Sequence, residues 1–279
     1  MKSKLLLVPL FAILFITIPA LAHQPRIVDS KDTIVLNPTV SKAYYGKLSG
    51  DSHTYTINVT EAFNLYVGIL MPFYEESKKD VSAEIYKEGE SIQVLGGKSA
   101  DWKNMFEFFG QSTYLKSGEY KERVDAGEYT IIVSSPNNDS KYALAIGETE
   151  AFNGNEIINA LRVIPELKRN FFNESPLSFV KSPFGWGYIL IMYILAFVFG
   201  LLYRYILKTF AKGTVRGVNN NIGNYDRTIR LTIWLGLLIW AITTSWSPWL
   251  LFFSGFALFE ALFSWCGFYA TIGRNTCHS

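Results

Sequence analysis

The chain has 279 residues, of which 49% are hydrophobic and 18% charged, with a formal net charge of +2. A charge balance this even gives no strongly basic or acidic surface, and it argues against nucleic acid as a partner. The length leaves room for one domain or two, and the apolar residues are concentrated in a few segments.

Residues 1–22 have the features of a secretory signal peptide. Lys2 and Lys4 precede an uncharged apolar run, which ends in the small-residue pattern Ala20-Leu21-Ala22. This pattern predicts cleavage before His23. An uncleaved anchor is the alternative, because the run approaches the length that spans a bilayer. In both cases the following residues are expected outside the cytoplasm.

Residues 23–150 are predicted to form an extracytoplasmic β-sandwich domain. Short segments such as HTYTINV (53–59) and EYTIIVS (128–134) alternate between apolar and polar residues, and turn-forming residues separate them. This two-residue period is typical of strands, and several strands at such spacing favour an antiparallel sandwich.

Two stretches of this region resemble the pre-peptidase C-terminal type of β-sandwich. In YYGKLSGDSHTYTINV a glycine-containing strand leads into a turn, and in VDAGEYTIIVSSPNNDSKYALAIGE an Ala-Gly-x-Tyr turn leads into two strands. The resemblance implies a jelly-roll-like fold. It also implies an accessory, ligand-facing role like that of outer domains on other uncharacterised prokaryotic membrane proteins.

The predicted sandwich offers few residues for chemistry. A histidine-dependent nucleophile would have to use His53, but no Gly-x-Ser-x-Gly elbow or phosphate loop accompanies it. We therefore expect His53 to be a solvated turn residue, and we predict no catalytic residue, metal site or cofactor. The aromatic run DWKNMFEFFGQSTY (101–114) either belongs to the core or lines a ligand surface, and its alternation favours the core.

Residues 151–183 are predicted to form an amphipathic juxtamembrane connector. Apolar residues recur at helical spacing from Ile157 to Phe171, and Pro165 interrupts them, which predicts one kinked helix or two short ones. Such a helix either lies on the outer leaflet of the membrane or packs beneath the sandwich. Packing beneath the sandwich is the expectation that we favour.

Three transmembrane helices are predicted in the remainder. The first covers 184–207, a basic cytoplasmic loop covers 208–227, and two further helices, about 228–246 and 248–270, form a hairpin with a short uncharged turn. The loop and its flanks carry six basic residues and one acid, so the positive-inside rule places it in the cytoplasm. The carboxyl terminus is then cytoplasmic and the sandwich lies outside.

The carboxy-terminal segment resembles the YgaP-like inner-membrane transmembrane domain. The hairpin at 228–277 and the residues just before it carry the resemblance, through Asn221, Gly223, Asp226, Arg227, Arg230, Gly236, Cys266, Tyr269, Gly273 and Cys277. Two positions depart from the family pattern, namely Glu260 and Gly267. The resemblance implies a membrane hairpin that tends to self-associate, and the rhodanese activity of some members does not carry over because this chain has no such domain.

Cys266 and Cys277 are the only cysteines in the chain. On the reducing side of the membrane a permanent disulfide is not expected. A reversible thiol pair or a persulfide carrier is one interpretation, since Arg274 would favour the thiolate of Cys277. Two small packing residues are the interpretation that we favour, and a metal site would need ligands that the sequence does not provide.

Glu260 is the single acid within the predicted spans. Burying a carboxyl group in a membrane costs free energy unless the group has a partner or contacts water. Glu260 is therefore either part of a proton or cation relay or a hydrogen-bonding group at a dimer seam. We favour the seam. For Asp226 and Arg227, which precede a helix, we expect an interfacial structural role.

These features predict a non-enzymatic, multi-pass protein of the inner membrane. Its sandwich would bind an unknown extracytoplasmic ligand or protein, and its hairpin would contact the lipid bilayer and form a homo-oligomer. A membrane thiol or sulfur relay through the two cysteines is the alternative, and transport coupled through Glu260 is a weaker one.

Overall fold

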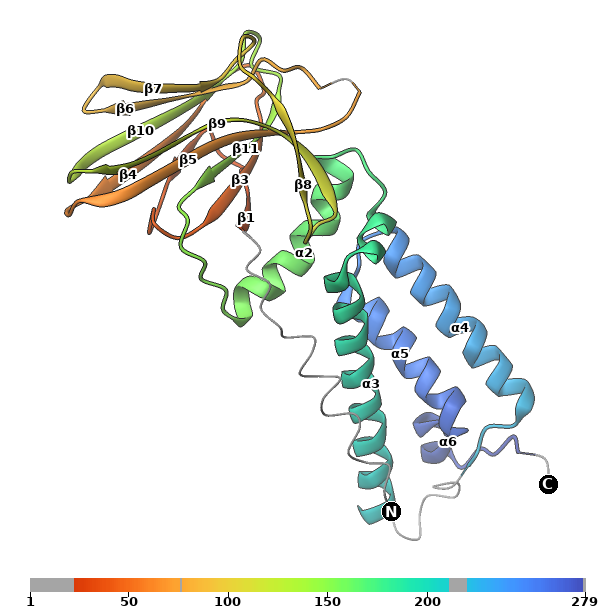
Figure 1. Ribbon diagram of the computed structural model, residues 1–279. Helices are drawn as coiled ribbons and strands as arrows, with labels where there is room; N and C mark the ends of the chain where they lie inside the picture. The colour runs from red at the N-terminus through yellow and green to blue at the C-terminus, as the bar shows by residue number, and fades with distance from the viewer. Residues whose placement is uncertain (1–22, 76, 211–219, 278–279) are drawn as a thin grey trace, which may run out of the picture.

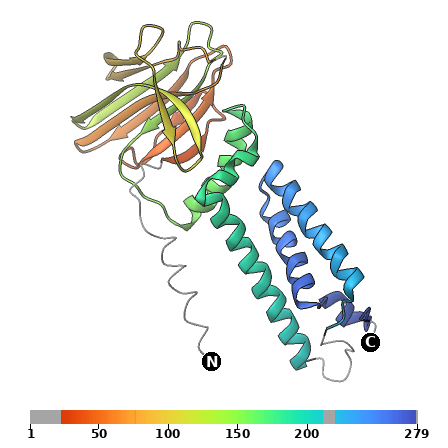
Figure 2. The ribbon, with the colours of Figure 1, turned by 45° about the vertical axis from the view of Figure 1, so that its right-hand side comes forward.

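The structure is a computed structural model in which residues 23–75, 77–210 and 220–277 are described. The predicted signal peptide and part of the predicted cytoplasmic loop lie outside the described residues. A domain of two β-sheets lies at one end of a bundle of helices, and a slanted helix joins them (Figures 1 and 2).

Two facing sheets form the domain. The six-stranded sheet has the order β1 (Gln24–Ile27), β3 (Lys42–Lys47), β11 (Lys141–Ile146), β5 (Phe63–Pro72), β9 (Ser112–Val124) and β8 (Lys103–Glu107). The five-stranded sheet has the order β2 (Asp32–Ile34), β4 (His53–Val59), β10 (Gly127–Ser134), β6 (Ser82–Lys87) and β7 (Glu90–Gly96). The predicted sandwich of two sheets is confirmed. The expectation that it is antiparallel throughout is wrong at β1 and β2, which pair in parallel with their neighbours, while the other pairs are antiparallel.

The core follows the two-residue period of the strands. In β4, Tyr55 and Ile57 are fully buried, while Thr54 and Thr56 next to them are partly exposed. β5 differs, because nearly all of its residues are buried. Leu65 and Val67 face the second sheet, whereas Tyr66 faces the connector helix on the outer side of the sheet. Burial on both faces explains why this strand has a nearly continuous apolar sequence.

A chain of polar rings crosses the interior between the sheets. The hydroxyl of Tyr142 lies 2.7 Å from Nδ1 of His53 and 2.7 Å from the hydroxyl of Tyr55. His53 is only 7% exposed, and burial lowers its pKa below its ordinary range. The expectation of a solvated turn residue was therefore wrong, because His53 begins β4 and its ring points inward.

Gly46 makes room for this ring chain. A Cβ atom at position 46 would lie 2.5 Å from Cζ of Tyr142, which rests directly on strand β3. The tyrosine of the Ala-Gly-x-Tyr turn also has a structural role, since the Tyr129 hydroxyl donates a hydrogen bond to the carbonyl of Asp125 at 2.9 Å. This contact resembles the tyrosine corner of other sandwiches.

We expect Gly46→Ala to destabilise the sandwich by about 1–3 kcal/mol, because the added methyl group must displace a fully buried ring. Thermal unfolding of the purified protein, followed by near-UV circular dichroism, measures the effect. Gly118→Ala, in β9, is the matched control, because its added Cβ would make only an ordinary contact, 3.7 Å from Cδ2 of Leu95, and its φ is not positive. An unchanged unfolding midpoint for Gly46→Ala would contradict the proposed close contact.

The aromatic run at 101–114 divides between core and surface. Trp102 and Tyr114 are buried, but Phe106 and Phe108 are 59% and 45% exposed. Phe109, in the turn between β8 and β9, packs on Phe184 of the helical part, with ring centroids 4.5 Å apart and ring planes tilted by 39°. The expectation of core packing therefore holds for only part of the run.

The connector consists of a helix and a short 3₁₀ turn. α2 (Gly154–Asn170) continues through Pro165, and η1 (Pro176–Lys181) follows after a short loop. Asn153 caps α2 by accepting a hydrogen bond from the Glu156 N–H at 3.0 Å. The helix packs on β1 of the sandwich and also contacts α3, so it joins the two parts of the molecule.

Hydrogen bonds hold the second half of the connector to both the bundle and the sandwich. Trp246 Nε1 donates to the carbonyl of Pro176 at 3.0 Å, and the Ser182 hydroxyl donates to the carbonyl of Phe109 at 2.7 Å. Lys168, which is buried, donates to the carbonyl of Gln111 at 2.6 Å. The sandwich is therefore held against the end of the bundle through several non-covalent contacts in addition to the covalent connection.

The helical part contains α3 (Pro183–Phe210), α4 (Asn224–Thr243), α5 (Pro248–Phe263) and α6 (Gly267–Ile272). Among the described residues, α3 is the one helix that is both long and apolar enough to cross a membrane, and α5 is a shorter apolar helix. The second hairpin helix was predicted to reach residue 270. It ends at Phe263 instead, because Ser264 adopts a left-handed conformation with φ of 49°, and Cys266 then caps α6.

Candidate functional site

A buried ion pair lies at the end of the bundle far from the sandwich. Nη1 of Arg230 on α4 is 2.5 Å from Oε2 of Glu260 on α5, and Glu260 is 4% exposed. Nη2 of the same arginine lies 3.5 Å from Sγ of Cys266. The carboxylate that was expected at a dimer seam therefore has a charged partner within its own chain.

Asn221 holds the segment that follows α5. Its Nδ2 donates to the carbonyl of Cys266 at 2.9 Å, and its Oδ1 accepts from the backbone N–H of Cys266 at 2.8 Å. The asparagine is fully buried. Both backbone groups of Cys266 are thus satisfied by a side chain from the start of the hairpin, where the chain between α5 and α6 is not helical.

The other residues of the predicted family motif complete this cluster. The Gly223 N–H donates to the Thr276 hydroxyl at 3.1 Å, and that hydroxyl donates in turn to the Asp226 carboxylate. Nε of Arg227 donates to the carbonyl of Ala261 at 3.1 Å. A Cβ atom at Gly223 would lie 2.2 Å from the Thr276 carbonyl, so the close approach of these segments requires glycine there.

The two cysteines have different surroundings. Cys266 is buried and Cys277 is exposed, and both are free thiols. Gly273 ends α6 with φ of 73°, and the N–H of Cys277 donates to Oδ1 of Asn275. The buried cysteine thus belongs to the cluster around Arg230, whereas the exposed one lies beyond it.

The chemistry that this cluster can support is restricted by its contacts. The Glu260 carboxylate is bound by Arg230, and the asparagine contacts main-chain atoms instead of the thiol. Among the described residues there is no group of three histidine, cysteine, aspartate or glutamate side chains placed to hold a metal ion. The arrangement is suited to locking the hairpin and its carboxy-terminal segment together.

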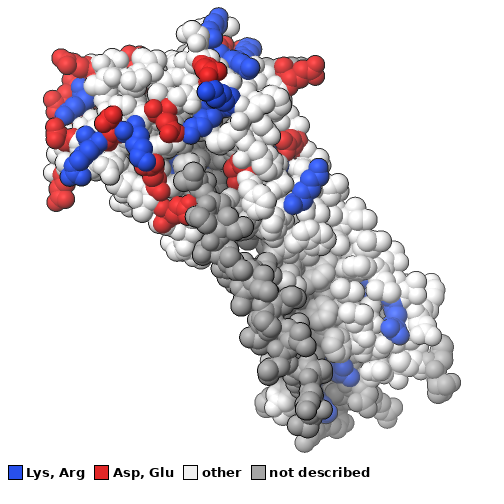
Figure 3. All heavy atoms as spheres, viewed as in Figure 1, with Lys and Arg blue, Asp and Glu red and all other residues white. Residues whose placement is uncertain are grey.

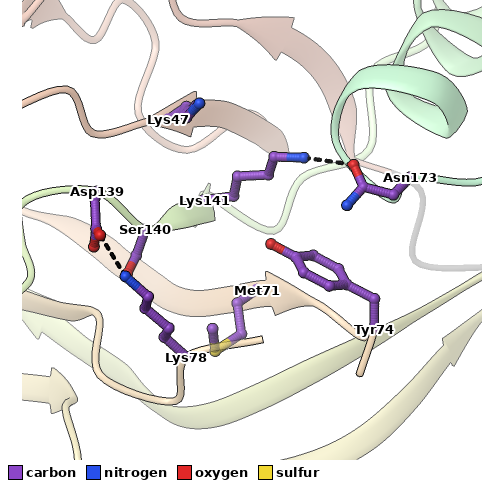
Figure 4. A pocket seen from close by; sticks show the side chains of 8 residues that line it. All are labelled: Lys47, Met71, Tyr74, Lys78, Asp139, Ser140, Lys141 and Asn173. Atoms are coloured by element: carbon purple, nitrogen blue, oxygen red, sulfur yellow. Dashed lines mark hydrogen bonds and ion pairs between the residues drawn. The ribbon is translucent and has the colours of Figure 1, made fainter. Parts of the chain in front are cut away.

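A pocket of about 290 Å³ lies on the sandwich, next to the carboxyl end of α2 (Figure 4). Strand ends, the loops after β5 and β10 and the loop after α2 supply its walls, with the lining residues Lys47, Met71, Tyr74, Lys78, Asp139, Ser140, Lys141 and Asn173. No sequence motif indicates this pocket, because its residues come together only when the two sheets and the connector are assembled.

The pocket has an excess of positive charge, with three lysines and one acid among its lining residues. Lys78 forms an ion pair with Asp139, and Lys141 donates to Oδ1 of Asn173 at 2.9 Å (Figure 4). Burial, together with the charge of Lys47, lowers the pKa of Lys141 below its ordinary range. Lys47 forms no ion pair within the described part of the chain.

Comparison with known protein families supports the resemblance of the carboxy-terminal segment. Residues 218–279 match the family described as inner membrane protein YgaP-like, transmembrane domain. The matched segment contains the motif residues that the structure brings together around Cys266, from Asn221 to Thr276. No curated protein matches the sequence of the chain.

Solved structures resemble the sandwich region only distantly. The pre-peptidase C-terminal domain of a collagenase from Bacillus anthracis is 14% identical, with a TM-score of 0.27 over 45% of this chain and 96% of that one. CorA, a surface-associated copper-binding protein of Methylomicrobium album BG8, is 8% identical, with a TM-score of 0.24 over 45% of this chain and all of that one. A β-glucosidase from Paenibacillus barengoltzii is 9% identical with a TM-score of 0.24, over 47% of this chain and 14% of the enzyme. No functional conclusion follows from these likenesses.

Proposed function

For a membrane protein that joins a YgaP-like transmembrane domain to a β-sandwich, we propose a non-enzymatic role in the cell envelope. The sandwich lies outside the inner membrane, three helices cross the membrane, and the carboxyl terminus is cytoplasmic. The pocket beside α2 binds a small anionic ligand or an anionic group of a larger partner. The excess of lysine in this pocket is the observation that carries the proposal.

The distribution of charge along the molecule supports this orientation. The sandwich packs against the start of α3, whereas Arg204 and Lys208 lie near the other end of this helix. The 28 residues of α3 extend over about 42 Å, which is more than the apolar thickness of a bilayer. In Figure 3 the charged side chains gather on the sandwich, and those visible along the helical part are basic and few. Basic residues at the end far from the sandwich favour a cytoplasmic position for that end.

The relay and transport alternatives have less support. A thiol relay needs an accessible sulfur that passes a group to a second one, but Cys266 is buried within the hairpin. Transport through Glu260 needs a carboxylate that exchanges its partner, and this one is held by an arginine in a nearly closed site. A structural lock accounts for both side chains without either activity.

Binding measurements on the full chain in detergent test the pocket. The probes are inorganic phosphate, pyrophosphate and citrate, and the variant is Lys47→Glu combined with Lys78→Glu. We expect the variant to weaken binding of the best probe by at least about tenfold, because each substitution replaces a lysine that attracts the anion with a glutamate that repels it. Lys98→Glu combined with Lys103→Glu changes the same net charge outside the pocket, and it should leave binding within about twofold.

Failure of all three probes to bind, or equal losses in the two double variants, would contradict the pocket assignment. Protease added to spheroplasts, in which the outer membrane has been opened, tests the orientation independently. Cleavage within the sandwich is expected, while the segment at 204–230 should be cut only after the spheroplasts are lysed.

A further inference from the structure

α2 carries two apolar stripes that face different parts of the molecule. Val163 and Leu167 pack on the outer face of the six-stranded sheet. Leu161 and Ile164 instead pack on the cluster of Phe179, Tyr188 and Trp246 at the end of the bundle nearest the sandwich. The helix therefore lies between the sandwich and the helical bundle, and one apolar stripe packs on each of them.

The second stripe continues beyond the bundle and is exposed there. Ile157 lies one helical turn before Leu161, so the two side chains share a face. Ile157 and its neighbour Ile158 are 50% and 54% exposed. A pair of exposed isoleucines is unremarkable alone, but this pair extends a stripe that is already packed on the bundle.

Polar contacts prevent the first half of α2 from turning this face toward the sandwich. Arg26 of β1 forms a bidentate ion pair with Glu156, with Nη1 2.9 Å from Oε2 and Nη2 2.7 Å from Oε1. Nδ2 of Asn159 donates to the carbonyl of Pro25 at 3.1 Å. These bonds hold one side of the helix on β1, so the isoleucines remain directed away from the sandwich.

Other exposed apolar side chains surround this end of the bundle. Phe184 and Trp186, in the first turn of α3, are 42% and 59% exposed, and Trp249, near the start of α5, is 71% exposed. Aromatic residues at the ends of apolar helices are typical of the boundary between lipid and water. α2 slants from beneath the sandwich to the level of the first turns of α3 (Figures 1 and 2).

The geometry points to α2 as an interfacial helix, whose Ile157 and Ile158 are inserted into the surface of the lipid bilayer while Val163 and Leu167 hold the sandwich. The occupant of the exposed stripe is lipid, because the stripe is continuous with side chains packed on the sandwich end of a membrane bundle, where Phe184 and Trp186 in the first turn of α3 are also exposed. The helix thereby fixes the height and tilt of the sandwich above the membrane. Only the choice of the outer leaflet rests on the proposed function.

Fluorescent labelling of the full chain tests this inference. In a Cys277→Ser background, in which the remaining native thiol is buried, Ile157→Cys and Ile158→Cys are each labelled with a polarity-sensitive dye. The protein is reconstituted in phosphatidylcholine vesicles that carry a nitroxide quencher either near the top of the acyl chains or near the bilayer centre. The background protein without an added cysteine measures any labelling of Cys266.

We expect blue-shifted emission from both positions and at least about twofold quenching by the shallow nitroxide, since interfacial helices insert only about 5–10 Å. Glu166→Cys is the matched control for Ile157→Cys, because residue 166 is exposed and lies about 180° around α2 from residue 157, so it should give water-like emission. Both isoleucines are at least half exposed, so neither substitution removes a core side chain.

Three results would overturn the inference. Water-like emission at 157 and 158 would show that the stripe does not contact lipid. Blue-shifted emission without quenching would show that protein, such as a second copy of the chain, covers it. Stronger quenching by the central nitroxide would place the helix inside the bilayer instead of at its surface. A reversed orientation would contradict the proposed function alone, because the shallow quenching would persist and would be found on the inner leaflet.

Discussion

Replacing Arg230 with methionine is expected to lower the free energy of unfolding of the helical part by about 3–5 kcal/mol, because it leaves the carboxylate of Glu260 buried without its charged partner. Methionine retains most of the apolar stem of arginine, so the loss reports mainly on the charge. Unfolding by titration with a denaturing detergent, followed by tryptophan fluorescence, measures the change.

The double variant Arg230→Met with Glu260→Leu separates this charge effect from a loss of packing. Removing both charges leaves no unpaired group, so the double variant should regain most of the lost stability. Arg274→Met is a control, since both Arg230 and Arg274 lie over the ring of Tyr269, but Arg274 is exposed and its replacement should change stability by less than about 0.5 kcal/mol. If the single and double variants were equally destabilised, the ion pair would not be the cause.

The sandwich was largely predictable from the sequence because strand periodicity is a local signal. Alternation in residues 53–59 and 128–134 corresponds to β4 and β10, which pair with each other. The burial of His53 was not predictable in the same way. A polar residue beside a turn is usually solvated, and its burial here depends on the hydroxyl of Tyr142, which is 89 residues away in the chain.

The motif residues of the hairpin were predictable, but their partners were missed. Arg230 and Glu260 lie at nearly equal distances from the turn between α4 and α5, so an antiparallel hairpin brings them to the same depth. The number of residues between each side chain and the turn can be counted in the sequence, and it would have predicted that Arg230 and Glu260 pair. The end of α5 at Phe263 was not available, because it depends on the left-handed Ser264 and on the contacts of Asn221 with the next residues.

The end of α5 at Phe263 depends on Asn221. We expect Asn221→Ala to destabilise the hairpin by about 2–4 kcal/mol. The substitution removes two hydrogen bonds, at 2.9 and 2.8 Å, and leaves the buried N–H of Cys266 without a partner, while the Cys266 carbonyl retains only its bond from the Ala270 N–H. The same detergent titration measures the loss. Asn275→Ala is the matched control, because Asn275 is exposed and should tolerate the change.

The reactivity of Cys266 distinguishes this specific role of Asn221 from a general loss of packing. In a Cys277→Ser background the buried thiol should react slowly with a maleimide reagent in the folded protein. Once the Asn221 side chain is removed, the segment between α5 and α6 loses the side-chain hydrogen bonds to its main chain, and the thiol should react at least about tenfold faster under folding conditions. If reactivity is unchanged while stability falls, the asparagine does not hold this segment closed. If both change together, the thiol is protected by the clamp, and its burial follows from the architecture of the hairpin instead of from a need for sulfur chemistry.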